Sequence, residues 1–200
     1  MNLTKVDNGE NHVRLNDARF ILVRNNPNLK VTFEDDQLTI NNEPIADYMS
    51  KNPGVVLTFN ATETTEAGKD NVYKINPQSS HYSIVAGSAS ILGLDDHVDY
   101  YLYEYKNPDG YNLLKEPVKL KFYAEYDATK PGVFANNYPY LTVVGGESTE
   151  ELAFMVENSA GVELPSTGGI GTTIFYVLGG IMVVGAAVLL ITKKRMGAEV

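Results

Sequence analysis

The chain has 200 residues, of which 44% are hydrophobic, and this length supports one or two domains with a real core. Its 25 acidic and 16 basic residues give a net charge of -9, which argues against a surface that follows nucleic-acid phosphates. The chain has no cysteine, which excludes disulfides, thiol nucleophiles and cysteine-based zinc or iron–sulfur sites.

Short apolar runs, some with clear two-residue alternation, predict an all-β domain. Clusters of Asn, Asp, Gly and Pro between the runs supply the turns of an antiparallel sandwich. Strands are expected at residues 3–6, 20–23, 55–59, 100–105, 118–124, 140–144 and 152–156. A short helix is indicated only at residues 44–50. The pattern predicts one β-sandwich over residues 1–159, with a long variable insertion at about residues 24–90.

Three polar residues, Lys5, Glu104 and Asn158, fall on strand faces that are otherwise apolar. Burying single charges costs several kcal/mol, so we expect the three side chains to be buried together. An amine, an amide and a carboxylic acid in a dry site can form a side-chain amide and expel ammonia, because burial favours the neutral amine and the protonated acid. The alternative is that each is an ordinary surface or turn residue.

The C-terminal region has a different composition. A short linker at residues 160–163 precedes a pentapeptide, and residues 170–192 then run without a charge. A helix of that length reaches roughly 34 Å, enough to cross a hydrocarbon core of about 30 Å. The basic residues 193–195 place its far end in the cytoplasm and residues 1–169 outside. A buried core helix is the alternative. The pentapeptide consists of Leu164, Pro165, Ser166, Thr167 and Gly168.

An outward-facing domain needs an export signal. The first ten residues, MNLTKVDNGE, contain no basic segment leading into an apolar one. We therefore expect the chain to be the C-terminal piece of a longer precursor.

The order of pentapeptide, apolar span and basic tail over residues 164–195 resembles the cell-wall sorting signal of Gram-positive surface proteins. Pro165 fixes an extended, kinked backbone, and Gly168 leaves the carbonyl of Thr167 open to attack. The resemblance implies that a sortase cysteine cleaves after Thr167 and passes the acyl group to an amine of peptidoglycan or of a neighbouring pilin subunit. The chain would then lie at the cell surface, attached covalently to cell wall or pilus, and in the membrane only before sorting.

Three segments of the domain resemble pilins with CnaB-like domains. The first hairpin, residues 5–20, and the last strand before the pentapeptide match that family. The resemblance implies an Ig-like, CnaB-type sandwich with an isopeptide bond between Lys5 and Asn158, promoted by Glu104. Asp17 and Asn107 depart from the pattern, because the family usually has Gly and Ala there. The E-box of the family is represented by Tyr100, Leu102, Glu104, Pro108, Gly110 and Tyr111.

We therefore expect a structural subunit of a covalent pilus or fimbria that is a sortase substrate and not an enzyme. Its expected partners are the sortase, neighbouring subunits or a peptidoglycan amine, and host surface receptors, but no nucleic acid. Two alternatives stay open: the stalk of a sortase-anchored adhesin that binds a host protein or glycan, and a wall-anchored enzyme with its catalytic domain upstream.

We expect neither a cofactor nor a metal. His12, His81 and His97 lie in separate segments without the spacing of metal ligands. The acidic run at residues 95–99 lacks the spaced ligands and the glycine of an EF-hand loop.

Overall fold

The computed structural model of the chain describes residues 1–64, 70–150 and 152–161. Residues 1–161 form one compact unit. No helix within the described residues is long and apolar enough to cross a membrane. The predicted span at residues 170–192 lies outside them.

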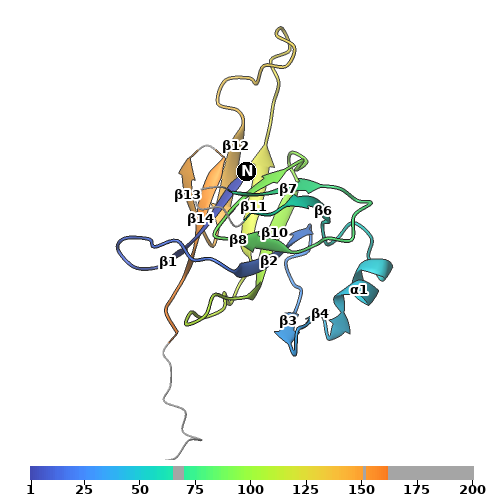
Figure 1. Ribbon diagram of the computed structural model, residues 1–200. Coiled ribbons are helices and arrows are strands. Elements are labelled where there is room, and N and C mark those ends of the chain that lie inside the picture. Colours follow the sequence, from blue (N-terminus) through green and yellow to red (C-terminus); the bar gives the residue numbers. More distant parts are fainter. Residues whose placement is uncertain (65–69, 151, 162–200) are drawn as a thin grey trace, which may run out of the picture. The chain divides into compact units, whose positions relative to one another are not determined.

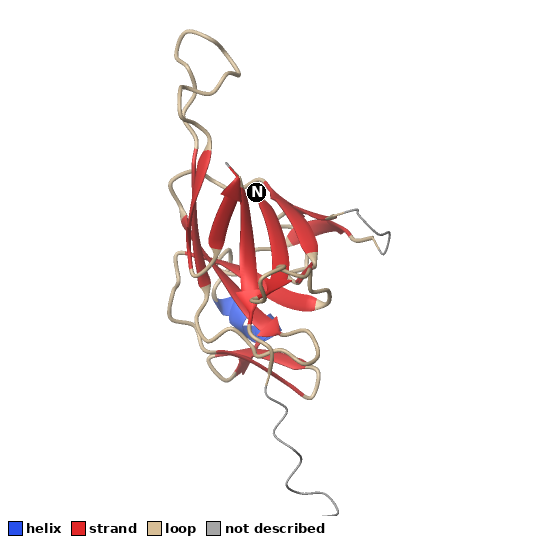
Figure 2. Ribbon diagram, turned by 90° about the vertical axis from the view of Figure 1, so that its left-hand side faces the viewer, coloured by secondary structure: helices blue, strands red, loops and turns tan. Residues whose placement is uncertain are grey.

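Two β-sheets that pack face to face make up the body of the unit (Figures 1 and 2). The six-stranded sheet has the order β13-β14-β1-β9-β7-β6 and the five-stranded sheet the order β12-β11-β10-β2-β8. This arrangement confirms the prediction of a mainly β sandwich. The six-stranded sheet contains β1 (Asn2–Asp7), β6 (Phe59–Thr62), β7 (Asn71–Ile75), β9 (Ser88–Leu92), β13 (Glu147–Glu150) and β14 (Ala153–Asn158). The five-stranded sheet contains β2 (Ala18–Arg24), β8 (Ile84–Ala86), β10 (Asp99–Lys106), β11 (Val118–Tyr123) and β12 (Tyr140–Val144).

The central strands β2 and β10 are apolar on both faces because each face borders a separate core. Phe20 and Leu102 point into the core between the two large sheets, where both are fully buried. Ile21 and Tyr103, one position further along, point to the opposite face and into a second core. Since successive residues of a strand face opposite sides, a strand covered on both sides has a continuous apolar run.

A small third layer covers that opposite face of the five-stranded sheet. Its strands are joined by two-residue turns at Asp35–Asp36 and Asn41–Asn42, and all four residues have positive φ. Type I′ hairpin turns require this conformation, which Asp and Asn tolerate better than most residues. The predicted helix is confirmed by α1, which packs Ile45 into the second core. The layer consists of β3 (Val31–Glu34), β4 (Gln37–Ile40), β5 (Glu43–Pro44) and α1 (Ile45–Lys51).

The sequence predictions fail in two places. A strand over residues 55–59 is wrong, because Val56 forms a single bridge to Val23 and the strand β6 begins only at Phe59. Residues 55–59 run from beside β2 in the five-stranded sheet to β6 in the six-stranded sheet, so their apolar side chains are divided between the two cores. The purely antiparallel arrangement is also wrong, because β1 pairs with β14, and β7 with β9, in parallel.

Strand β1 lies between β14 and β9 and carries the first candidate site residue. Its register places Lys5 opposite Val156 of β14. On the other side, the backbone N–H of Lys5 donates to the carbonyl of Gly87, 3.0 Å away, where the chain passes from β8 to β9. A Cβ atom at position 87 would overlap the present position of the Asn16 side chain, which would have to move.

Candidate functional site

Lys5, Glu104 and Asn158 meet in the interior between the two large sheets. Lys5 is on β1 and Asn158 ends β14, while Glu104 reaches them from β10 in the opposite sheet. The exposed fractions are 0% for Lys5, 1% for Asn158 and 5% for Glu104. The structure thus brings together the three polar residues that interrupt apolar strand faces, although Lys5 and Asn158 are 153 positions apart in the sequence.

The amide of Asn158 lies between the amine and the carboxyl group. Lys5 Nζ donates to Asn158 Oδ1 at 2.6 Å and to the carbonyl of Val156 at 3.1 Å. Asn158 Nδ2 donates to Glu104 Oε1 at 2.9 Å and to Oε2 at 3.1 Å. Lys5 Nζ is also 3.8 Å from Glu104 Oε1. The amine, the amide and the carboxyl group are therefore in mutual contact.

Local strand geometry explains why these side chains point inward. Glu104 follows Tyr100 and Leu102 on the same face of β10, and both are fully buried. The pairing of β10 with β2 shifts register directly after Glu104. On β14, Asn158 continues the buried face of Val156, and the parallel pairing brings it within reach of the Lys5 side chain. The alternation of side chains along strands of two sheets thus directs Lys5, Glu104 and Asn158 into the same buried site.

Burial shifts the pKa values of both charged groups toward their neutral forms. The pKa of Lys5 is lowered to about 8 by desolvation, which outweighs the opposing attraction of the Glu104 carboxylate. Desolvation raises the pKa of Glu104, against the attraction of Lys5 and the hydrogen bonds to the carboxylate. A neutral amine is a nucleophile and a protonated carboxyl group is an acid, so both shifts favour acyl transfer.

The loop between β10 and β11 holds the Glu104 carboxyl group in place. The backbone N–H of Leu114 donates to Glu104 Oε2 at 2.9 Å. The Asn107 side chain donates to the carbonyls of Pro108, at 3.3 Å, and of Tyr111. Asn107 therefore stabilises the turn of the E-box-like segment. Sequence reasoning missed the contact of Leu114, because a backbone donor from a loop leaves no residue-type signal.

Further residues of the E-box-like segment support β10 and the turn that follows it. The hydroxyl group of Tyr100 accepts a hydrogen bond from the backbone of Asp95 at 2.9 Å. Pro108 is buried, and Gly110 has a φ of 82°. The first hairpin shows a related feature, because Asp17 has a φ of 67°. A positive φ explains why glycine suits this position and why aspartate is tolerated there.

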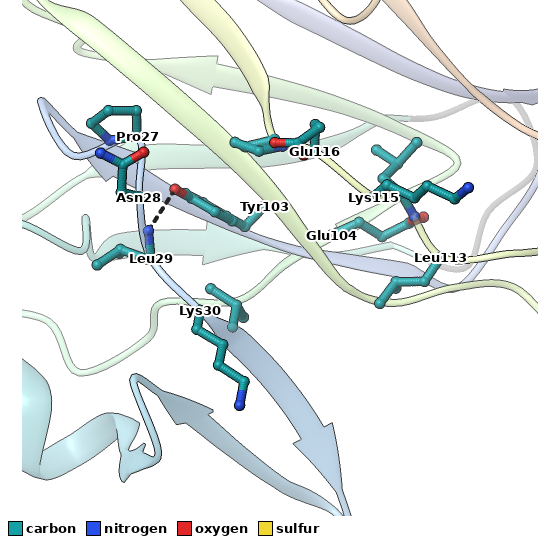
Figure 3. Close-up of a pocket in the computed structure, with 12 residues that line it drawn as sticks. Pro27, Asn28, Leu29, Lys30, Tyr103, Glu104, Leu113, Lys115 and Glu116 are labelled. Atoms are coloured by element: carbon teal, nitrogen blue, oxygen red, sulfur yellow. Dashed lines mark hydrogen bonds between the residues drawn. The ribbon is translucent and has the colours of Figure 1, made fainter.

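A pocket of about 350 Å³ opens beside Glu104 (Figure 3). Figure 3 shows Leu113 and Lys115 of the β10–β11 loop near Glu104 on one side, and Pro27 and Asn28 on the other. Glu104 is one of the residues that line the pocket, although its side chain has no exposed surface.

The five residues of the predicted sorting motif, 164–168, lie outside the described residues. The three histidines each approach a single carboxylate. Within the described ranges, no group of three or more His, Asp or Glu side chains has an arrangement that fits a metal ion. The pairs are His12 with Glu157, His81 with Glu63 and His97 with Asp96.

Comparison with known proteins identifies the C-terminal region. Residues 156–196 match the family described as LPXTG cell wall anchor motif. No curated protein matches the chain. Among solved structures, the group B streptococcus pilus 2b backbone protein is 21% identical with a TM-score of 0.33, which does not establish a shared fold. That match covers 82% of this chain and 42% of the streptococcal chain, so this chain spans less than half its length. The chain thus carries an LPXTG cell-wall anchor, the mark of a cell-surface protein that is attached covalently to the cell wall.

Proposed function

We propose that the chain is a structural subunit of a covalent surface pilus, joined by a sortase at Thr167 and braced by an isopeptide bond between Lys5 and Asn158. The observation that carries this proposal is the buried contact of 2.6 Å between an amine and an amide, with a carboxyl group beside both. A buried charged group without a reaction partner is costly, whereas the product of this reaction is an uncharged amide.

The reaction begins with transfer of a proton from the Lys5 ammonium to the Glu104 carboxylate. Neutral Nζ then attacks Cγ of Asn158, forming the new N–C bond, and the bond from Cγ to Nδ2 breaks. Of the three ammonium protons, one stays on the new amide, one reaches the departing nitrogen, and one remains on Glu104. Ammonia is released. Glu104 can carry these protons because it contacts Nδ2 at 2.9 Å and lies 3.8 Å from Nζ.

The reaction occurs once in each molecule and leaves a covalent brace. The chain therefore has no turnover of its own. In this proposal it is the substrate of a sortase.

The proposed organisation has three parts. Residues 1–159 are a CnaB-type, Ig-like sandwich, residues 160–163 a linker, and residues 164–200 the sorting signal, with a transmembrane helix at 170–192 and a basic tail at 193–195. The match of residues 156–196 to the LPXTG anchor supports the third part. The parallel pairing of the first and last strands supports the first, because it brings the bonded residues together.

Anchoring and polymerisation are tested together by Thr167→Ala, with Ser166→Ala as a matched control at the variable position of the motif. In sortase-positive cells the intact precursor, as wild type or with Ser166→Ala, should appear in the wall fraction as a ladder of high-mass species that survives boiling in detergent, joined through Thr167 and a lysine upstream of this chain. The Thr167→Ala chain should be absent from it, because its scissile residue is changed. If the Thr167→Ala variant were still attached covalently to the cell wall, that result would contradict cleavage at this site. A single wild-type band at monomer size would contradict polymerisation and favour an adhesin stalk.

A further inference from the structure

The last described residues of the chain are fixed to the loop between β10 and β11 (Figure 1). The backbone of Asn112 donates to the carbonyl of Ser159 at 2.9 Å, and its side chain donates to Ser159 Oγ and to the carbonyl of Ala160, both at 3.2 Å. Gly161 donates from its backbone to the carbonyl of Gly110 at 2.8 Å. These hydrogen bonds therefore fix the chain as far as Gly161, three residues after the end of β14.

This attachment limits how far an enzyme acting at the sorting motif can be from the sandwich. Thr167 lies six positions after Gly161, so six Cα–Cα steps join them. Even fully extended, they span at most about 22 Å. A small folded domain is about 30 Å across. An enzyme that holds Thr167 in its active site must therefore approach the surface around Gly161.

That surface contains a hollow of about 460 Å³ formed by the β1–β2 connection and the β10–β11 loop. Arg14, Arg19 and Lys106 line it, together with the acidic residues Asp17 and Asp109. The net charge of the residues that line the hollow is positive, whereas the net charge of the whole chain is -9. Arg14 and Arg19 are exposed, and neither forms a salt bridge to another residue of the described part of the chain. Their guanidinium groups are thus free to bind carboxylates of a partner.

We propose that this terminal surface, defined by Arg14, Asp17, Arg19, Lys106 and the loop of residues 107–112, is a docking surface for the sortase that cleaves after Thr167. The inference rests on the proposed cleavage at that residue. Arg14 and Arg19 bind acidic side chains of the enzyme. Asn112 is a positioning residue, because it holds the exit of the chain next to the hollow. The enzyme then recognises the folded domain as well as the pentapeptide.

The test measures cleavage of the full chain, purified in detergent, by a sortase of the source organism. The double variant Arg14→Glu/Arg19→Glu is compared with Lys74→Glu/Lys130→Glu, which makes the same charge change at exposed positions outside the hollow. We expect kcat/KM of the first variant to fall by at least about tenfold, mainly through KM, because the charge reversal removes the contacts of both arginines with the enzyme. A tenfold change corresponds to about 1.4 kcal/mol of binding energy. The control should stay within about twofold of wild type.

A second pair of chains carries a flexible Gly/Ser insertion after Gly161, long enough to separate the motif from the terminal surface. With this insertion, Arg14→Glu/Arg19→Glu should be cleaved nearly as well as its matched wild type, because the motif then reaches the enzyme without contact between the two surfaces. Equal cleavage of wild type and Arg14→Glu/Arg19→Glu without the insertion would overturn the docking surface and leave sortase cleavage intact. A wild-type chain that is not cleaved would instead contradict the proposed function.

Discussion

In the proposed reaction, Glu104 decides whether the three buried side chains can react. Its two oxygens accept hydrogen bonds from Asn158 and from the backbone of Leu114, so its carboxyl group is held toward the amide. Desolvation raises its pKa and lowers that of Lys5, and each shift makes proton transfer from the amine to the carboxylate easier. Lys5 and Glu104 form a coupled pair that shares one proton in its reactive state.

This sharing predicts a bell-shaped pH dependence for bond formation. Above about pH 8, near the lowered pKa of Lys5, the pair loses its shared proton and Glu104 becomes a carboxylate that cannot protonate the leaving nitrogen. Toward acid pH, once Glu104 is protonated from solvent, Lys5 remains an ammonium ion. The rate is measured by mass spectrometry after chain purified in urea is refolded in buffers on both sides of neutrality. A rate that keeps rising far above the Lys5 pKa would contradict the role of protonated Glu104.

At the scale of elements, the parallel pair β1–β14 is the part of the fold on which the site depends. The alternation of apolar residues identified both strands and their inward polar residues from sequence alone, because period two is visible within a single strand. It did not reveal that they pair in parallel, since the partner of a strand is set by contacts between distant segments. The strands of the third layer were missed for another reason: their turns use Asp35–Asp36 and Asn41–Asn42 instead of the glycine-containing pairs that mark hairpins.

A bond between the first and last strands should raise thermal stability strongly. The bond would close a loop that runs from Lys5 to Asn158. In the chain-entropy estimate, closing a loop of this length raises the free energy of unfolding by about 5 kcal/mol, which corresponds to roughly 10–20 °C in Tm for a domain of this size. Lys5→Met removes the bond without leaving a buried ammonium ion, and calorimetry should show a loss of that order. Lys74→Met, at an exposed position, is the matched control. Equal melting temperatures for wild type and Lys5→Met would contradict a covalent brace.

For the whole molecule, the position of the proposed bond would determine which residues carry a mechanical load. In a polymer pulled at the N-terminal side of Lys5 and at Thr167, force would pass through the bond directly to Asn158. The segment between these two residues, which contains both cores, would then carry almost none of it. Without the bond, the same force would shear β1 from β14, because the two strands lie side by side in parallel. The site therefore suits a protein that works under tension.

The mass of the intact chain tests the brace most directly. The wild-type chain should be about 17 Da lighter than its sequence requires, because ammonia is lost when the bond forms, a covalent change of the side chains. Glu104→Gln keeps the shape of the side chain but cannot carry the proton, so it should have its full sequence mass. A peptide map of the lighter species should show Lys5 joined to Asn158. A folded wild-type chain that keeps its full sequence mass after long incubation would contradict the account.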